Sequence, residues 1–284
     1  MSKPAKKVPA SDGLIAREAG AWTEEKLYYV ERYARAFATA MRSKWPRLVY
    51  VDLLCGPGYC IVRDSRREIA GSPLRALAVR PAFDAFHFAD LDEQNVAALR
   101  QRVVEHADVV IHKGDCNSIV RQVVKDLTPR TLTLAFLDPV GLEVEFETLR
   151  VLSRHRVDIV YLFPSGIGLK RNIKQFVRSE AAKMERFWGG VEWRDLPLAR
   201  RSAGQRVSTE EASIAGQWVG AFAQKVRAEL GMRCAHAPPM IANDGNAVMY
   251  HLLFLSKNPK ALEIWDRCRQ TEASGQRLLP YRKP

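Results

Sequence analysis

Four aspartates stand at or just beyond the ends of predicted strands, and they are the residues in this sequence best suited to chemistry. They are Asp52, Asp90, Asp115 and Asp138. In an open α/β sheet the carboxyl ends of the strands meet at one edge, where ligands bind. Carboxylates there can accept hydrogen bonds from the hydroxyl and amino groups of a nucleotide-like cofactor. The alternative for each residue is a helix N-cap, because aspartate is common where a strand turns into a helix.

A glycine turn follows the first of these strands. The run 48–54 is almost entirely apolar and β-branched, which favours a central strand buried on both faces. It ends on Cys55, Gly56, Pro57 and Gly58. Glycines at this point let the backbone approach a ligand closely, although a plain structural turn is the alternative. A dinucleotide fingerprint would require a third glycine at position 61, where the chain has Ile61.

Alternating strands and helices must position these residues. We expect strands over 48–54, 86–92, 109–117, 132–137 and 159–163, with helices over 96–104, 118–127 and 145–154 between them. This alternation predicts an α/β fold with a doubly wound, Rossmann-like, mostly parallel sheet. A helix over 24–43, N-capped by Thr23, precedes it. A helix over 208–230, an antiparallel hairpin over 239–255 and a helix over 259–268 follow it.

The composition suggests one domain with additions. Residues 1–21 are expected to be a flexible basic tail, 22–270 a single domain, and 271–284 a second basic tail. A short hairpin over 60–70 should lie over the ligand-binding edge. No apolar run is long enough to span a membrane, and no secretory signal is visible. The five cysteines are scattered, which indicates reduced thiols, a cytoplasmic location and no metal site.

A basic segment is inserted after the last parallel strand, at about 165–207. Residues 165–206 hold ten Lys and Arg against four Asp and Glu, a net +6 that is half of the formal charge of +12. Lys170, Arg171, Lys174 and Arg178 would form one positive stripe on a helix. A solvated surface is the alternative, but the position beside the ligand-binding edge favours contact with nucleic acid.

The turn at 52–58 resembles motif I of class I S-adenosylmethionine-dependent methyltransferases, in a variant with a bulky residue replacing an earlier glycine. The resemblance implies S-adenosylmethionine as cofactor, with Cys55, Gly56, Pro57 and Gly58 near its methionine portion and ribose. Asp52 would order this loop and balance the amino or sulfonium charge. Asp90, with Leu91 beside it, would accept both ribose hydroxyls, whereas Asp92 suits a helix cap better. Asp115 would accept from the adenine amine, and the backbone of Cys116 would contact the ring edge.

Asp138 and Pro139 occupy the position where amine-methylating members of that class carry Asp-Pro-Pro-aromatic. There the acid and a backbone carbonyl hold the exocyclic amine, so we assign the catalytic role to Asp138 and Pro139. The aromatic is missing, because Val140 and Gly141 follow. Stacking on the target base would therefore come from Phe163, Tyr161 or a ring of the inserted segment.

A closer resemblance covers residues 22–268 in order. It rests on Trp22 to Leu27, the turn at 52–58, Gly71 to Leu74, Gly114 to Asn117, Phe136 to Gly141, Leu162 to Pro164 and Tyr250 to Phe254 with Asn258-Pro259. As a set these motifs look like the three-Cys-motif partner (TcmP) family. The resemblance implies a class I methyltransferase-like fold and association with a separate cysteine-motif protein. It implies little about chemistry, and the basic segment has no counterpart in it.

The sequence as a whole favours a methyltransferase that uses S-adenosylmethionine and acts on nucleic acid rather than protein. The second hypothesis is a non-catalytic Rossmann-like binding subunit that serves a partner. A nucleotide hydrolase with the aspartates as metal ligands is weaker, because acids at separate strand ends lack compact ligand spacing. The oligomeric state, the target base and the choice between RNA and DNA are not predicted by any of these patterns.

Overall fold

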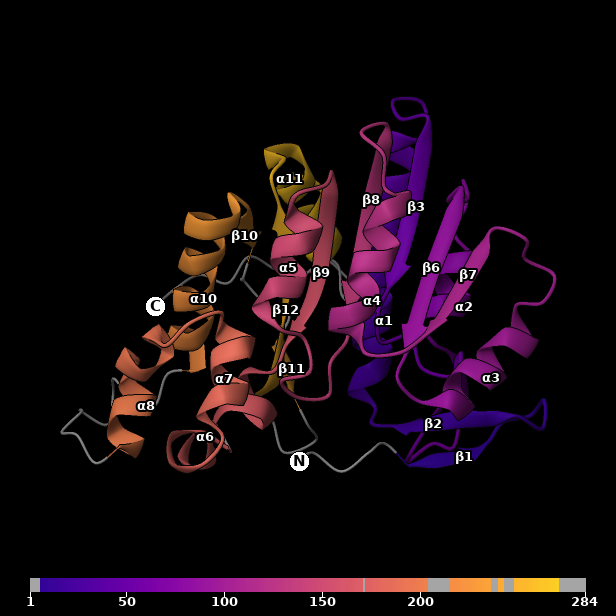
Figure 1. The fold of residues 1–284 in the computed structure, drawn as a ribbon. Helices are drawn as coiled ribbons and strands as arrows, with labels where there is room; N and C mark the ends of the chain where they lie inside the picture. Colours follow the sequence, from indigo (N-terminus) through magenta and orange to yellow (C-terminus); the bar gives the residue numbers. More distant parts are fainter. Residues whose placement is uncertain (1–5, 171, 204–214, 236–239, 243–247, 271–284) are drawn as a thin grey trace.

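A large central β-sheet, flanked by helices on both faces, dominates the molecule (Figure 1). The computed structural model describes residues 6–170, 172–203, 215–235, 240–242 and 248–270. In spatial order the strands are β7 (Val109–Lys113), β6 (Ala85–Asp90), β3 (Arg47–Asp52), β8 (Thr131–Leu137), β9 (Val157–Phe163), β12 (Val248–Ser256) and β10 (Arg233–Ala235), with β11 (Met240–Ala242) also paired to β12. The predicted α/β fold with a mostly parallel sheet is confirmed.

The direction of strand addition reverses at the centre of this sheet. The five strands from β7 to β9 are parallel, and β12 runs antiparallel to β9. From β3 the chain moves outward to β6 and β7, and it then crosses back to β8 on the other side of β3. Such a reversal opens a crevice at the carboxyl ends of the two central strands. The turn predicted between β11 and β12 lies outside the described residues.

Two hydrophobic cores hold the helices on the sheet. On one face lie α1 (Trp22–Met41), α2 (Ser72–Leu77), α3 (Glu93–Arg102) and α11 (Pro259–Arg269); on the other lie α4 (Cys116–Val123), α5 (Phe146–Ser153) and α10 (Ala215–Leu230). The side chains of β3 alternate between them. Leu48 and Tyr50 enter the first core, and Val49 and Val51 enter the second. A strand that contributes to two cores must be apolar throughout, which explains its sequence.

The chain near the N-terminus is ordered, so the predicted flexible tail over 1–21 is wrong for residues 6–19. There β1 (Lys7–Pro9) and β2 (Ile15–Ala19) form a hairpin that joins β4 (Tyr59–Val62) and β5 (Glu68–Ala70) in a second sheet. Strand β2 pairs in parallel with β4, and Val8, Ala16 and Ile61 bury one another. The hairpin predicted over 60–70 is confirmed as β4 and β5.

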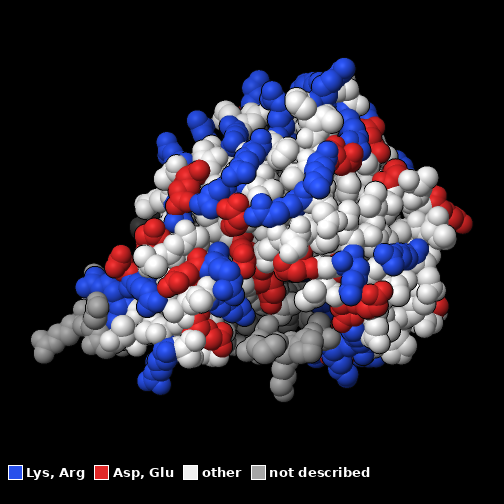
Figure 2. Space-filling model, viewed as in Figure 1, with Lys and Arg blue, Asp and Glu red and all other residues white. Residues whose placement is uncertain are grey.

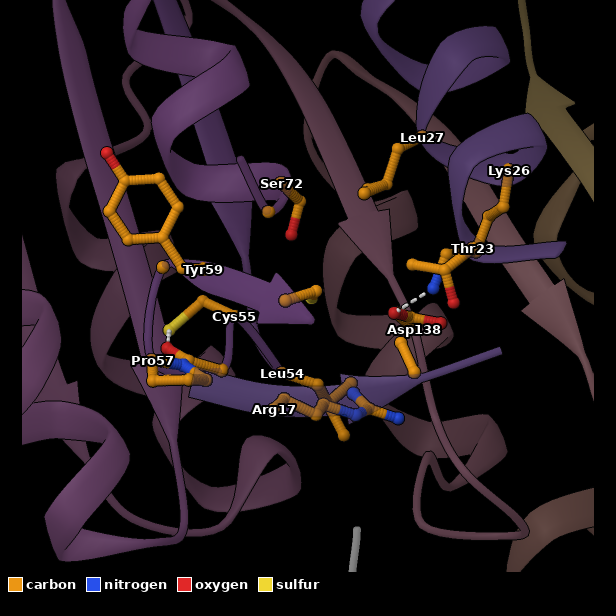
Figure 3. Close-up of a pocket in the computed structure, with 15 residues that line it drawn as sticks. Arg17, Thr23, Lys26, Leu27, Leu54, Cys55, Pro57, Tyr59, Ser72 and Asp138 are labelled. Atoms are coloured by element: carbon orange, nitrogen blue, oxygen red, sulfur yellow. Dashed lines mark hydrogen bonds and ion pairs between the residues drawn. The ribbon is translucent and has the colours of Figure 1, made fainter. Parts of the chain in front are cut away.

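The first long helix begins earlier than predicted. Helix α1 starts at Trp22 after Ala21, which makes no side-chain cap hydrogen bond. Thr23 is therefore not the N-cap; it lies buried inside the first turn. This shift matters for the site, because the first turns of α1 face the carboxyl ends of β3 and β8 (Figure 3).

The inserted segment is helical but broken into short pieces. It comprises the π-helix η2 (Ser165–Lys170), α6 (Ile173–Arg178), α7 (Ala181–Trp188), the 3-10 helix η3 (Glu192–Asp195) and α8 (Pro197–Ser202). Since η2 ends at Lys170 and α6 begins at Ile173, the prediction of one continuous basic stripe is wrong. Lys174 and Arg178 remain exposed on α6. Arg171, the side chain of Lys170 and both predicted outer tails (1–5 and 271–284) lie outside the described residues.

Positive charge is spread over the visible surface rather than gathered on the inserted segment. Figure 2 shows Lys and Arg side chains across the whole face, with Asp and Glu between them. Part of the inserted charge is neutralised locally, since Arg194 contacts Glu185 at 3.0 Å and Arg186 contacts Glu145 at 2.8 Å. Within the described ranges, no helix is long and apolar enough to cross a membrane.

Candidate cofactor and active site

Two adjoining cavities lie at the carboxyl ends of the central strands. The large cavity has a volume of about 450 Å³ and extends from Leu91 to Val140; the narrow cavity, of about 30 Å³, lies against the glycine turn. Arg17, Leu54 and Asp138 line both, so the two spaces meet there. A volume of several hundred Å³ is typical of a small-molecule site. The cavities therefore mark the crevice that the strand order predicts.

The glycine turn forms the wall of the narrow cavity. Gly56 has a positive φ of 67°, and a Cβ built on it would meet no atom within 4 Å, so its backbone faces open space. The amide of Gly71 donates to the carbonyl of Gly58 at 2.7 Å, and a Cβ at Gly71 would come within 2.8 Å of that oxygen. The turn is thus fixed from behind by the start of α2 while its front stays open. The turn therefore presents an open stretch of backbone to the narrow cavity.

Asp90 and Asp92 have different positions, as the sequence predicted. Asp92 is the N-cap of α3 and accepts from the amides of Gln94 and Asn95. Asp90 lies at the end of β6 and lines the large cavity, where Oδ2 accepts from the Gly56 amide at 2.9 Å. This bond joins the acid to the glycine turn. Leu91, which follows it, is 69% exposed and also lines the large cavity.

The third acid is a helix cap that also lines the large cavity. Asp115 is the N-cap of α4, and its side chain accepts from the Ser118 amide at 3.1 Å. Asp115 is therefore a helix N-cap, the alternative given for each of the four aspartates. Asp115 and Cys116 nevertheless also line the large cavity. Burial raises the pKa of the Cys116 thiol to about 12, with Asp115 and Glu143 adding to the effect. At neutral pH this cysteine is an uncharged lining residue.

Asp52 is buried behind the turn and lines neither cavity. Its Oδ1 accepts from the Leu54 amide at 3.2 Å, while Oδ2 has no hydrogen-bond partner among the described residues. Burial raises the pKa of Asp52 to about 7, and the neighbouring Ser72 side chain opposes this shift. The bond to Leu54 agrees with the predicted role in ordering the loop. The predicted balance of the amino or sulfonium charge stays a prediction, and Asp52 would have to exert it from behind the turn because it lines neither cavity.

Asp138 is held by a lysine that the sequence analysis did not single out. Lys26 Nζ lies 2.5 Å from Asp138 Oδ2, and the two side chains are only 6% and 10% exposed (Figure 3). Lys26 lies on the buried face of α1 with Val30 and Tyr33, four and seven residues further on. A lysine on an otherwise apolar helix face is the signal that could have revealed it. The ion pair fixes the carboxylate at the junction of the cavities.

The aromatic residues proposed to stack on a target base are in the core instead. Phe163 is fully buried, with its ring 4.7 Å from that of Phe222, and Tyr161 is 1% exposed. Trp188 and Trp193 of the inserted segment are buried as well. The prediction of a substrate-stacking role for Phe163 is therefore wrong, because β9 is covered by α10 and α7 rather than open at its end. The nearby Tyr250 hydroxyl donates to the Val140 carbonyl at 3.2 Å.

The N-terminal hairpin places two cations at the large cavity. They were missed in the sequence because residues 1–21 were predicted to be a flexible tail. Lys7 and Arg17 are opposite each other in the β1–β2 pairing, and both line the large cavity. Lys7 is paired with Asp92, whose Oδ2 lies 2.5 Å from its Nζ. The exposed Lys174 and Arg178 border neither cavity. Across the described residues, no group of three or more His, Cys, Asp or Glu side chains is arranged to hold a metal ion.

Comparison with solved structures shows the fold. The chain resembles protein LPL1258 from Legionella pneumophila str. Philadelphia 1, described by family-model DUF519, with a TM-score of 0.51 at 12% identity over 90% of this chain and 95% of that one. Weaker likenesses include the methyltransferase domain of bacterial CtHen1-CN (TM-score 0.38, 11% identity, 80% and 99% covered) and a putative O-methyltransferase from Klebsiella pneumoniae (0.39, 10%, 82% and 88%). No protein-family model and no curated protein matches the sequence. At such identities only the shared fold follows.

Proposed function

We propose that this protein is a class I S-adenosylmethionine-dependent methyltransferase. The observation that carries the proposal is the joint lining of one crevice by the glycine turn, Asp90 with Leu91, and Asp115 with Cys116. Three different strand ends supply these groups. The antiparallel β12 beside β9 agrees with the sheet that the resemblance implies.

The residues present fit this cofactor. The open backbone at Gly56 leaves room for a ligand chain, and the carboxylate of Asp90 can accept from the ribose diol. The exposed side chain of Leu91 offers an apolar surface for the adenine ring. When bound, the cofactor supplies an already activated methyl group on its sulfonium, so the protein's task is to position the acceptor and exclude water.

The cofactor assignment predicts micromolar binding of S-adenosylmethionine and S-adenosylhomocysteine, measured by isothermal titration calorimetry. Asp90→Ala should weaken binding by roughly 1–3 kcal/mol, because hydrogen bonds to the ribose and the support of the Gly56 amide are lost. Asp108→Ala is the matched control, since Asp108 is exposed and lines neither cavity. Absence of binding at millimolar cofactor would remove the methyltransferase proposal.

Nucleic acid is the proposed acceptor, supported by the formal charge of +12 and the exposed cations of α6. If Lys170, Lys174 and Arg178 contact phosphates, their triple alanine variant should lower the salt slope of RNA or DNA binding by about three units, one per residue. The control is the triple variant Arg233, Lys257 and Lys260 to alanine. Those exposed residues lie at the opposite edge of the sheet, where Arg233 pairs with Ser256. Equal slopes in all three proteins would exclude the inserted segment as a nucleic-acid surface.

A non-catalytic binding subunit is the second candidate, and two observations favour it. Asp138 is engaged by Lys26, and its neighbour Val140 offers no ring to a base. In that case the crevice would bind the cofactor without transferring its methyl group, and a cysteine-motif protein would be the partner that the TcmP resemblance implies. Methyl transfer from radiolabelled S-adenosylmethionine into RNA or DNA distinguishes the two candidates.

A further inference from the structure

Three cations line the two cavities, and their pairing differs. Lys7 contacts Asp92 and Lys26 contacts Asp138, each at 2.5 Å. The guanidinium of the third, Arg17, has no hydrogen bond or ion pair with any described residue, although the residue is only partly exposed. An unpaired guanidinium beside a cavity is a strong donor for a planar anion.

The position of Arg17 narrows the choice of that anion. Residues 15, 17 and 19 alternate to one face of β2, and both Arg17 and Ala19 line the narrow cavity. In Figure 3 the guanidinium points toward the side of the pocket where Lys26 and Asp138 lie. Arg17 also borders the large cavity, so it stands at the junction of the two spaces. A ligand that fills both spaces passes this guanidinium.

S-adenosylmethionine has one anionic group, the α-carboxylate of its methionine portion. Its adenosine portion matches Asp90, Leu91 and Asp115 in the large cavity, which directs the methionine portion toward the glycine turn and the narrow cavity. Lys26 is committed to Asp138, so the remaining cation for the carboxylate is Arg17. We infer that Arg17 of the N-terminal hairpin binds the cofactor's α-carboxylate and is a specificity residue for the amino-acid end of the ligand; this inference rests on the proposed function.

The consequence is selectivity between ligands that share adenosine. S-adenosylhomocysteine carries the carboxylate, whereas 5′-methylthioadenosine retains the nucleoside and the sulfur but lacks the amino-acid end. Arg17→Ala should raise the Kd of S-adenosylhomocysteine roughly 10- to 100-fold, as expected for loss of a charge-assisted bidentate contact. The Kd of 5′-methylthioadenosine should change by less than about twofold. The Kd of Arg17→Lys for S-adenosylhomocysteine should fall between those of wild type and Arg17→Ala, because lysine keeps the positive charge but cannot donate two parallel hydrogen bonds.

Calorimetry with both ligands on the full chain tests the inference. Arg63→Ala is the matched control: Arg63 is an exposed cation just beyond β4 of the same small sheet, it contacts Glu18 at 3.5 Å, and it lines neither cavity. The control should leave both Kd values unchanged. Equal weakening of both ligands by Arg17→Ala would overturn the inference and assign Arg17 a structural role, while the proposed function would stand.

Two other outcomes also decide the matter. Unchanged affinity for both ligands, with weaker binding of RNA or DNA, would overturn the inference by showing that the guanidinium faces a phosphate of the acceptor. Failure of the wild type to bind either ligand would overturn the proposed function and this inference together. The Kd of 5′-methylthioadenosine distinguishes a loss of the carboxylate contact from a general loss of binding. An unchanged value also shows that the Arg17 variant is folded.

Discussion

At the scale of single residues, the pair formed by Lys26 and Asp138 determines how the acceptor site can be tested. Both side chains are buried, and removing one partner of such a pair leaves an uncompensated charge that costs about 3–5 kcal/mol. Asp138→Ala would therefore mix a loss of stability with a loss of chemistry. Asp138→Asn also removes the negative charge, but it keeps the side-chain size and an oxygen that can accept a hydrogen bond from Lys26, so it disturbs the buried pair less than alanine does.

If Asp138 holds the methyl acceptor, Asp138→Asn should abolish turnover and keep the Kd of S-adenosylhomocysteine within about twofold. A group that acts on the reacting centre affects the rate more than ground-state binding of the cofactor. Single-turnover methyl transfer and calorimetry on the same preparation measure the two quantities. Lys44→Met, a change at an exposed lysine outside both cavities, provides the control. Parallel losses of rate and cofactor affinity would show that Asp138 supports the fold of the loop.

The four acids show what could be deduced from single residues and what could not. Their placement at strand ends followed from the alternating pattern, and the distinction between Asp90 and the cap Asp92 followed from spacing. The side chains that these aspartates contact could not be deduced from the sequence. Lys26 meets Asp138 across 112 residues, and no local pattern encodes such a contact. The burial of Asp52 beneath its own loop likewise depends on how α2 packs on the turn.

At the scale of elements, α3 links the N-terminal hairpin to the glycine turn through one side chain. The Arg102 guanidinium donates to Asp12 at 2.7 Å and to the carbonyls of Ile15 and Pro57, and it lies 4.8 Å from the centre of the Tyr59 ring. This contact also holds the pKa of the Asp12 carboxyl below its usual value. One buried arginine thus joins three segments around the cavities.

Arg102→Ala should loosen the hairpin and the glycine turn together. We expect faster tryptic cleavage after Lys7 and Arg17, detected by mass spectrometry, and a several-fold higher Kd for S-adenosylhomocysteine. Arg100→Ala, a change at an exposed arginine of the same helix, should alter neither. Unchanged cleavage in the Arg102 variant would show that the pairing of β2 with β4 holds the hairpin without help from α3.

The elements that the sequence predicted well are those with strong local patterns. The parallel strands are continuous apolar runs, and α1 has a clear helical period, so both were found within a few residues. Strands β1 and β2 have three and five residues; β1 pairs with β2, and β2 in turn pairs with β4. Short polar strands carry little periodic signal, which explains why they were taken for a tail. Leu169 of η2 and Ile173 of α6 are likewise buried in one core with α10 and β9, a long-range packing that no local pattern of the inserted segment encodes.

At the scale of the whole molecule, Asp158 links three elements at the edge opposite the cavities. Its carboxylate accepts from the Tyr33 hydroxyl of α1 at 2.8 Å and from the Ser256 hydroxyl of β12 at 2.5 Å. Burial nevertheless raises the pKa of Asp158 to about 6. A raised pKa in the folded state means that the proton bound there stabilises the protein at low pH. That contribution is lost as pH rises from about 4 through about 6.

The unfolding free energy of wild type should therefore fall by about 2 kcal/mol relative to that of Asp158→Asn between pH 4.5 and 7.5. Urea unfolding of both proteins at several pH values measures it. Comparing the two proteins cancels the contribution of Asp52, whose pKa is raised to about 7 by its own burial. A constant difference across this range would mean that Asp158 titrates as it does in the unfolded chain.

The parallel pairing of β2 with β4 also sets an order of events during synthesis. Residues 7–19 leave the ribosome before any strand of the central sheet, yet Arg17 can pair with its neighbour on β4 only when Cys60 has been made. The intervening chain includes α1 and β3, so closing this loop costs entropy until those elements are in place. The hairpin over residues 7–19 is consequently expected to order late, and because it belongs to a separate sheet its opening would leave the central sheet paired. Because Lys7 and Arg17 line the large cavity, a local opening of the hairpin would widen that cavity at far less cost than separating the central strands.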